Sequence, residues 1–269
     1  MLKENIPMSN IPFFKYQGAG NDFILIDNRG LEYSNLTEKQ VNFLCNRRFG
    51  VGADGLMLLQ NHTAYDFEMH YYNADGRLGS MCGNGGRCIV AFAKAIGIIN
   101  RETNFLAVDG AHYAKISEAG NWVDLQMIDV QDIQQDEEAF VLNTGSPHYV
   151  LEVSNLEALD VFAEGKRIRN NNTYKEKGIN VNFIEDKGDH FFIRTFERGV
   201  EDETYACGTG VTAVALAKAK QAKTTGHFSK AIKVLGGDMR VEYNYDGQTF
   251  TEIFLCGPAE LVFSGSIEI

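Results

Sequence analysis

The chain has 269 residues, of which 44% are hydrophobic and 23% are charged, and this balance excludes fibrous and disordered classes of protein. Its net charge of −11 argues against nucleic acid and anionic membranes as partners, because both bind basic surfaces. The opening "MLKENIPMSNIPFF" lacks the apolar core of a secretory signal, and "CIVAFAKAIGII" is too short to cross a bilayer. Five cysteines, an odd and sparse set, indicate free thiols, so we predict a cytoplasmic location.

Short segments rich in aromatic and β-branched residues predict strands throughout the chain. In the first half these segments are 22–27, 55–60, 66–72, 112–118 and 122–128. In the second half they are 148–153, 179–185, 190–196, 232–236, 239–245, 250–255 and 260–265. Helices are predicted over 37–48, 86–97, 155–170 and 210–222. The fold is therefore expected to be rich in strands, with few helices.

The second half repeats the order of elements in the first half. A strand, the turn "SMCGNGG" and the helix "RCIVAFAKA" are matched by a strand, the turn "YACGTG" and the helix "VTAVALAKA". Cys82 and Cys207 hold equivalent positions in the two copies. We therefore predict two copies of one α/β unit, over residues 1–130 and 131–269.

The two repeated helices are apolar almost all round, which predicts that each is buried on every side. A central helix wrapped by strands fits this pattern. The predicted fold class is therefore α/β (α+β), with two pseudo-symmetric halves. Each half is a curved, mostly antiparallel sheet or barrel around its own helix.

The two equivalent cysteines stand immediately before helices. Cys82 and Cys88 are spaced C-x5-C, which fits neither a zinc site nor a redox pair, and Cys88 falls in the apolar helix as a core residue. Cys82 and Cys207 occupy N-cap positions, where free N–H groups and the helix dipole favour thiolate, so the pKa of each is expected to fall. The glycines that follow allow a carboxylate or phosphate to approach. Two thiols flanking one α-carbon can remove and return its proton from opposite faces, which inverts the stereocentre.

Other motifs do not support a cofactor or metal site. "GVGADG", residues 50–55, follows a predicted helix and precedes a strand, the reverse of the order in a dinucleotide site. The six histidines are scattered, and His148 alone is interpreted as an exposed turn residue. We expect no cofactor and no metal. Two other classes stay open, a thiol redox protein using Cys82 and Cys207 and a non-catalytic small-molecule binder.

In chain order, the segments "KYQGAGNDFILID", "RRFGVGADGL", "YYNADGRLGSMCGNGGRC", "TGSPHYV", "GINVNF" and "TFERGVEDETYACGTGVTA" resemble the diaminopimelate epimerases. The resemblance implies a cofactor-independent isomerase that interconverts LL- and meso-diaminopimelate, in lysine and peptidoglycan precursor synthesis. It also implies an active site in the cleft between the two halves, a final strand that returns to the first half, and a homodimer.

The resemblance assigns a role to each matching residue. Cys82 and Cys207 are the catalytic pair, and Arg198 holds the distal carboxylate as a bidentate fork. The turns Gly83-Asn84 and Gly208-Thr209 bind the reacting α-carboxylate. Further substrate contacts are Asn21, Asn73, Asn180 and Glu197, with His148 and Ser146 in support.

Some positions depart from the family or from its relatives. Ser146 replaces the usual asparagine of "GNPH", and Gly55 replaces a glutamine that is sometimes present. The related racemases of proline and hydroxyproline carry a histidine after the first Cys-Gly, where this chain has Asn84. They also have Asp in place of the Glu-Arg pair, and Arg198 suits a substrate with a second carboxylate. A racemase of that type is the alternative enzyme.

Overall fold

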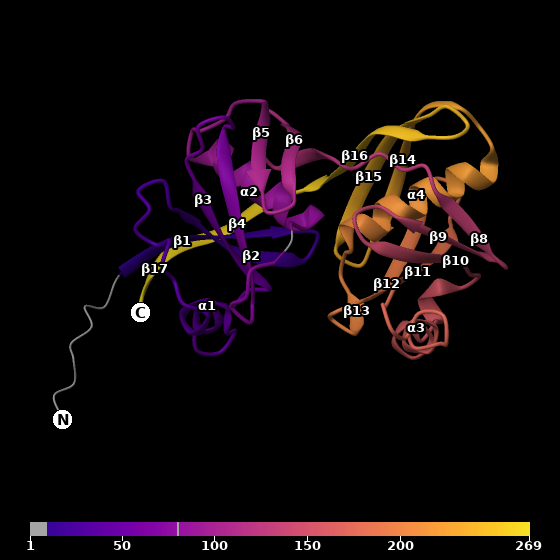
Figure 1. The fold of residues 1–269 in the computed structure, drawn as a ribbon, viewed down its shortest axis with the longest axis horizontal. Helices are drawn as coiled ribbons and strands as arrows, with labels where there is room; N and C mark the ends of the chain where they lie inside the picture. The colour runs from indigo at the N-terminus through magenta and orange to yellow at the C-terminus, as the bar shows by residue number, and fades with distance from the viewer. Residues whose placement is uncertain (1–9, 80) are drawn as a thin grey trace.

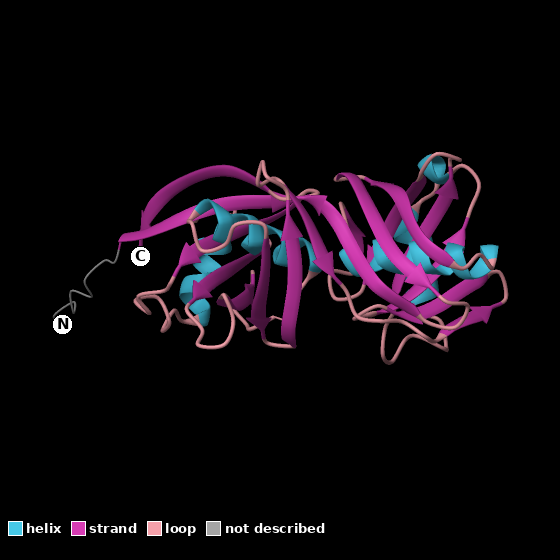
Figure 2. Cartoon of the chain, turned by 90° about the horizontal axis from the view of Figure 1, so that it is seen from above, coloured by secondary structure: helices cyan, strands magenta, loops and turns pink. Residues whose placement is uncertain are grey.

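Residues 10–79 and 81–269 are described in the computed structural model of the chain, shown in two views in Figures 1 and 2. The first nine residues of the segment examined for a secretory signal, and Ser80 beside the first cysteine turn, lie outside the described residues. None of the described helices is long and apolar enough to span a membrane.

The first half contains seven strands and two helices in the described residues, and most of them are labelled in Figure 1. In chain order these are β1 (Asn10–Gly18), β2 (Asn21–Asp27), α1 (Glu38–Cys45), β3 (Gly55–Gln60), β4 (Phe67–Asn73), α2 (Gly83–Ala95), β5 (Glu102–Ala107), β6 (Gly110–Ile116) and β7 (Trp122–Gln126).

The second half is described from β8 to the last strand. Its elements are β8 (Ile133–Asp136), β9 (Ala139–Asn143), β10 (Pro147–Glu152), the 3-10 turn η1 (Leu156–Ala158), α3 (Val161–Arg169), β11 (Asn180–Asp186), β12 (Phe191–Glu197), β13 (Asp202–Thr204), α4 (Gly208–Ala222), β14 (Gly226–Val234), β15 (Gly237–Tyr245), β16 (Phe250–Pro258) and β17 (Glu260–Glu268).

The two halves share one pattern of strand pairing. In the first half β2 pairs parallel with β3, β3 antiparallel with β4, and β4 parallel with β5. In the second half β10, β11, β12 and β14 pair in the same parallel, antiparallel, parallel order. Helices α1 and α3 occupy the same place in the two patterns, and so do α2 and α4. This confirms the predicted mixed fold of two pseudo-symmetric halves.

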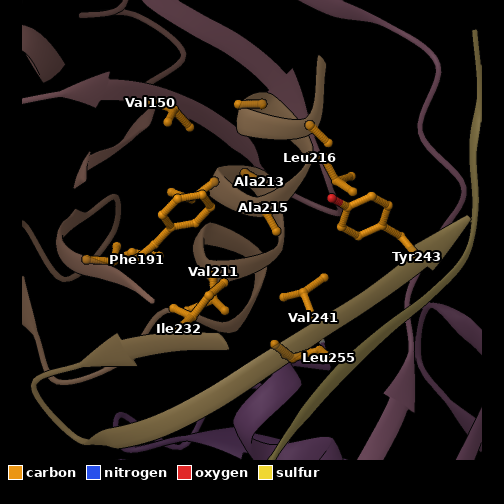
Figure 3. Close-up of a cluster of buried hydrophobic side chains, with 14 of the residues drawn as sticks. Val150, Phe191, Val211, Ala213, Ala215, Leu216, Ile232, Val241, Tyr243 and Leu255 are labelled. Carbon is orange, nitrogen blue, oxygen red and sulfur yellow. The ribbon is translucent and has the colours of Figure 1, made fainter. Parts of the chain in front are cut away.

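Each half encloses its own central helix, as Figure 2 shows for the two long helices inside the strands. Almost every residue of α2 from Gly83 to Ala93 is buried, with Phe92 and Cys88 fully enclosed. Around α4 the core includes Val211 and Leu216 together with strand residues, drawn in Figure 3. The all-round apolar helices are therefore buried on every side, as their sequences predict.

The final two strands connect the halves. β16 pairs antiparallel with β15 of the second half and with β7 of the first half. β17 then runs back along β1, where Asn10 lies opposite Glu268. In Figure 1 this last segment, in yellow, passes from the second half to the first. The halves are therefore joined through hydrogen-bonded strands as well as through the connecting chain.

Candidate active site

The two repeated cysteines cap the two central helices. Cys82 precedes α2 and Cys207 precedes α4, each with the extended backbone of an N-cap residue. The helix ends abut, because a Cβ added to Gly208 would lie 3.4 Å from the Cα of Gly83 and 2.8 Å from Cδ2 of Leu255. A side chain at either glycine would clash with Leu255, which packs against both helix ends. The positive ends of both helices therefore meet at one place.

A cleft of about 750 Å³ lies where the helix ends meet. It brings together every residue that the sequence places in the site except His148, which lies behind the cleft wall with no exposed surface. The predicted residues that line the cleft are Asn21, Asn73, Cys82, Gly83, Asn84, Ser146, Asn180, Glu197, Arg198, Cys207, Gly208 and Thr209.

Both thiols are harder to ionise than the sequence suggests. Burial raises the pKa of Cys82 to about 11 and that of Cys207 to about 12. The negative charge of Glu197 adds to the rise at both sulfurs. The N–H of Gly85, which donates to Cys82 Sγ at 3.2 Å, opposes it. The predicted fall in the pKa of the two cysteines is therefore wrong for the protein without substrate. Desolvation raises each pKa by more than the N–H groups of the helix ends lower it.

A chain of hydrogen bonds leads to the sulfur of Cys207. Thr195 Oγ1 donates to Asn182 Oδ1 at 3.0 Å, which turns the Asn182 amide N–H toward His148 Nδ1, 3.0 Å away. His148 Nε2 therefore carries the proton and donates to Thr209 Oγ1 at 2.8 Å. The Thr209 hydroxyl, 3.6 Å from Cys207 Sγ, is left to donate to sulfur. Burial also lowers the pKa of His148 to about 3, so its imidazole is neutral at ordinary pH.

One end of the cleft carries a guanidinium and an amide that share a serine. The Oγ of Ser146 accepts from Asn180 Nδ2 at 2.9 Å and from Arg198 Nη2 at 3.2 Å. Asn180 Oδ1 in turn accepts the backbone N–H of Arg198 at 2.9 Å. The hydroxyl at position 146 therefore takes two donors, and its own proton is free for a further acceptor.

The asparagines of the first half have different surroundings. Asn21 Nδ2 donates to Asp54 Oδ2 at 2.6 Å, and Asn21 Oδ1 accepts from Asn84 Nδ2 at 3.2 Å. Asn73 is exposed at the end of β4, where its carbonyl accepts the N–H of Gly76 in a turn. Asn21 is thus held by two side chains, whereas Asn73 is fixed through its backbone.

Glu197 is a carboxylate without a cation. Its Oε2 accepts from Thr204 Oγ1 at 3.0 Å, and burial raises its pKa. No ion pair forms with it among the described residues. Over residues 10–79 and 81–269, no three His, Cys, Asp or Glu side chains are grouped closely enough to hold a metal ion.

The site also contains residues to which the sequence motifs assign no role. Asp54 and Tyr71 line the cleft, and the ring of Tyr71 explains the glycine at position 55. A Cβ on Gly55 would lie 2.5 Å from Tyr71 Cε2 and 2.7 Å from the carbonyl of Tyr72, so no side chain fits there. Asn182 belongs to the chain behind Cys207. A polar residue in the middle of an apolar strand is the sequence feature that marks it.

Solved structures of low sequence identity share this fold. A phenazine biosynthesis protein of the PhzF family from Bacillus anthracis superposes with a TM-score of 0.75 at 16% identity, over 97% of this chain and 100% of that one. A probable proline racemase from Agrobacterium radiobacter gives 0.66 at 13% identity, over 96% and 92%. These matches place the chain in a class of two-domain folds that includes both proteins.

Sequence comparison then identifies the family. A diaminopimelate epimerase family model matches residues 13–131 and 140–262. The chain is 49% identical to the diaminopimelate epimerase of Flavobacterium psychrophilum over 255 residues, 94% of this chain and 99% of that protein. It is 46% identical to that of Chlorobaculum tepidum over 262 residues, with the same coverage. The chain belongs to the diaminopimelate epimerase family of isomerases.

Proposed function

We propose that the protein interconverts LL-2,6-diaminopimelate and meso-2,6-diaminopimelate by passing one α-proton between two thiols, without a cofactor. The observation that carries the proposal is the pair of cysteines at abutting helix ends, Cys82 and Cys207, related by the internal repeat. An epimerase needs a base and an acid on opposite faces of one carbon. The two copies of the cysteine turn supply the two thiols for these roles. Membership of the family indicates which substrate they act on.

The charges of the cleft match those of this substrate. The reacting α-carboxylate binds the first-turn N–H groups at Gly83-Asn84 and Gly208-Thr209, where two helix dipoles add. The α-ammonium lies beside Glu197, a partly buried carboxylate that has no cation partner among the described residues. Arg198 and the Asn180–Ser146 pair take the distal carboxylate at the far end.

The proton transfer follows from this placement. One thiolate takes the α-proton, so that the C–H bond breaks, an S–H bond forms and the electron pair stays on the α-carbon. The opposite thiol then gives its proton to the other face and becomes the thiolate for the reverse reaction. The ammonium offsets the charge of Glu197, which otherwise raises the pKa of both cysteines. Substrate binding thereby favours the thiolate that starts the reaction.

Solvent exchange at the α-carbon tests the reaction directly. Purified protein, free of pyridoxal phosphate and kept reduced, is incubated with LL-diaminopimelate in deuterium oxide. The proposal expects deuterium at the α-carbon together with formation of the meso isomer. Ligand binding without exchange would instead indicate a non-catalytic binder.

Single cysteine variants test the pair. Cys82→Ala and Cys207→Ala each lose epimerisation, because either change removes one of the two proton carriers. Cys88→Ala is the matched control, since Cys88 lies in the same helix but is wholly enclosed in the core. Near-normal turnover by either of the first two variants would refute the two-thiol mechanism.

We further propose a cytoplasmic homodimer that works in the synthesis of lysine and peptidoglycan precursors. Support for the dimer comes from β17, which exposes the neighbouring apolar side chains Leu261, Val262 and Phe263 on the first half. A second copy of the chain can cover such an apolar strand. Sedimentation velocity at micromolar concentration distinguishes a dimer from the single chain.

A further inference from the structure

Arg87 is a buried cation without a buried anion. Its side chain has no exposed surface, and it forms no ion pair with any carboxylate in the described part of the chain. Lys15, the other buried lysine or arginine over residues 10–79 and 81–269, differs because it contacts Asp22 at 2.7 Å. An unpaired buried charge is costly, so a feature of the site must compensate for it.

The guanidinium of Arg87 instead donates to three oxygens from two separate parts of the chain. It donates to the carbonyl of Gly83 at 3.2 Å, to Asn84 Oδ1 at 3.0 Å and to the carbonyl of Pro258 at 3.3 Å. The backbone of Gly257 lies against it, because a Cβ there would be 3.1 Å from Arg87 Nε. The guanidinium thus joins the first turn of α2 to the end of β16, the strand that crosses between the halves.

These contacts fix the orientation of Asn84. An arginine only donates, so the oxygen of the Asn84 amide must face Arg87 and its nitrogen must face away. That nitrogen donates to the carbonyl of Ala206 at 2.9 Å and to Asn21 Oδ1 at 3.2 Å. Ala206 immediately precedes Cys207. Asn84 therefore ties the first cysteine turn to the second, and Arg87 holds it in the only orientation that does so.

We propose that Arg87 is a positioning residue for the thiol pair, holding Asn84 across the two cysteine turns, and that its charge is balanced by the anion these turns bind. The proposal rests on the function proposed above. The anion is the α-carboxylate of the substrate or the Cys82 thiolate, since both lie at the same helix end as Arg87. A guanidinium suits this role because it stays charged even where burial lowers its pKa.

The positive charge of Arg87 lowers the pKa of Cys82, whereas other features of the site raise it. Burial and Glu197 raise the pKa of Cys82, whereas Arg87 and the N–H groups of the first turn lower it. Removal of the guanidinium therefore leaves the thiol harder to ionise. The other titratable groups close enough to interact electrostatically with Cys82 are Tyr71 of β4, Cys88 of α2 and Cys207 before α4.

The test compares Arg87→Met, which removes the charge at similar length, with Arg87→Lys, which keeps the charge but loses the fork. Arg101→Met, at a side chain 74% exposed, is the control. The first readout is the rate at which iodoacetamide alkylates Cys82 at pH 8, followed by peptide mass spectrometry. The second is kcat for epimerisation. The first readout needs no substrate, so it stays valid if the proposed function fails.

The two variants have different expected results. Arg87→Met slows alkylation of Cys82 at least threefold and lowers kcat at least tenfold. Arg87→Lys alkylates within twofold of the parent but still loses at least tenfold in kcat, because an ammonium cannot hold three oxygens in the guanidinium geometry. The control changes neither quantity.

A purely structural role would lower the free energy of unfolding and leave the alkylation rate of the folded protein unchanged, and that result overturns the proposal. If Arg87→Met does not fold, Arg87→Lys decides. Parent-like kcat in that variant refutes the positioning role, whereas low kcat with parent-like alkylation supports it.

Discussion

Replacing Thr209 with valine removes one hydroxyl and keeps the shape of the side chain. In the structure that hydroxyl accepts from His148 and stands 3.6 Å from the sulfur of Cys207, to which it can donate. The change therefore affects the thiolate at one end and the imidazole at the other. We expect both a smaller thiolate population at Cys207 and a less stable protein.

The size of each effect follows from the contacts. A hydrogen bond to a charged acceptor is worth about 1.5–3 kcal/mol, and the long sulfur contact places this one near the lower value, about tenfold in thiolate population. The thiolate that remains is more nucleophilic, so alkylation of Cys207 falls by about threefold. The buried Nε2–H of His148 loses its acceptor, which costs about 1–3 kcal/mol of the free energy of unfolding.

The assay measures alkylation of Cys207 at pH 8 by peptide mass, together with kcat and urea unfolding. Thr212→Val is the control, because Thr212 also belongs to α4, is buried, and its hydroxyl donates only to the carbonyl of Gly208, at 3.1 Å. That variant loses stability but keeps the reactivity of Cys207. Equal alkylation of Cys207 in the two variants would refute the donor role of Thr209.

Three further predictions concern other parts of the site. His148 has a pKa of about 3 when folded against about 6.5 when unfolded, so its stabilisation is complete above pH 6.5 and is lost as the pH falls. Between pH 7 and pH 5 the free energy of unfolding should fall by about 2 kcal/mol more than in His148→Gln, and parallel urea midpoints would contradict this. Arg198→Lys should raise KM for diaminopimelate at least tenfold with little change in kcat, because a point charge replaces a fork; an unchanged KM would remove Arg198 from the distal site. Gly208→Ala should cost about 1–3 kcal/mol in urea unfolding through its clash with Leu255, and parent-like stability would show that Leu255 moves aside freely.

Periodicity and repeats predict much of this fold, but five strands escape them: β1, β5, β8, β9 and β13. The four predicted helices correspond to α1, α2, α3 and α4, with the third preceded by a short 3-10 turn. β1 was not predicted from its sequence, in part because Pro12 interrupts the run. Pro12 lies where β1 pairs with β17 only, since the pairing with β2 begins at Phe14. β5, with the mixed sequence "ETNFLA", was also missed.

The residues of the candidate site also differ in how well the sequence predicts them. Those in recognisable motifs, such as the two cysteine turns, are correctly predicted to line the cleft. Arg87, Asn182 and Thr195 do not, because a polar residue inside a helix or strand gives no indication of its partner until tertiary contacts are known. The predicted fall in the pKa of Cys82 is wrong for a related reason. Burial of the sulfur raises that pKa, and burial depends on tertiary packing that the local motif does not contain.

The pairing of β1 with β17 sets the order in which the chain can fold. Strand β1 finds its partner at 260–268, so this part of the first sheet cannot form until the intervening chain, which includes the second half, has been synthesised. Pairings between such distant segments also slow folding, because a long loop must close first. The second half, by contrast, finds its main strand partners between β8 and β16. The sheet of the second half can therefore form before β1 meets β17.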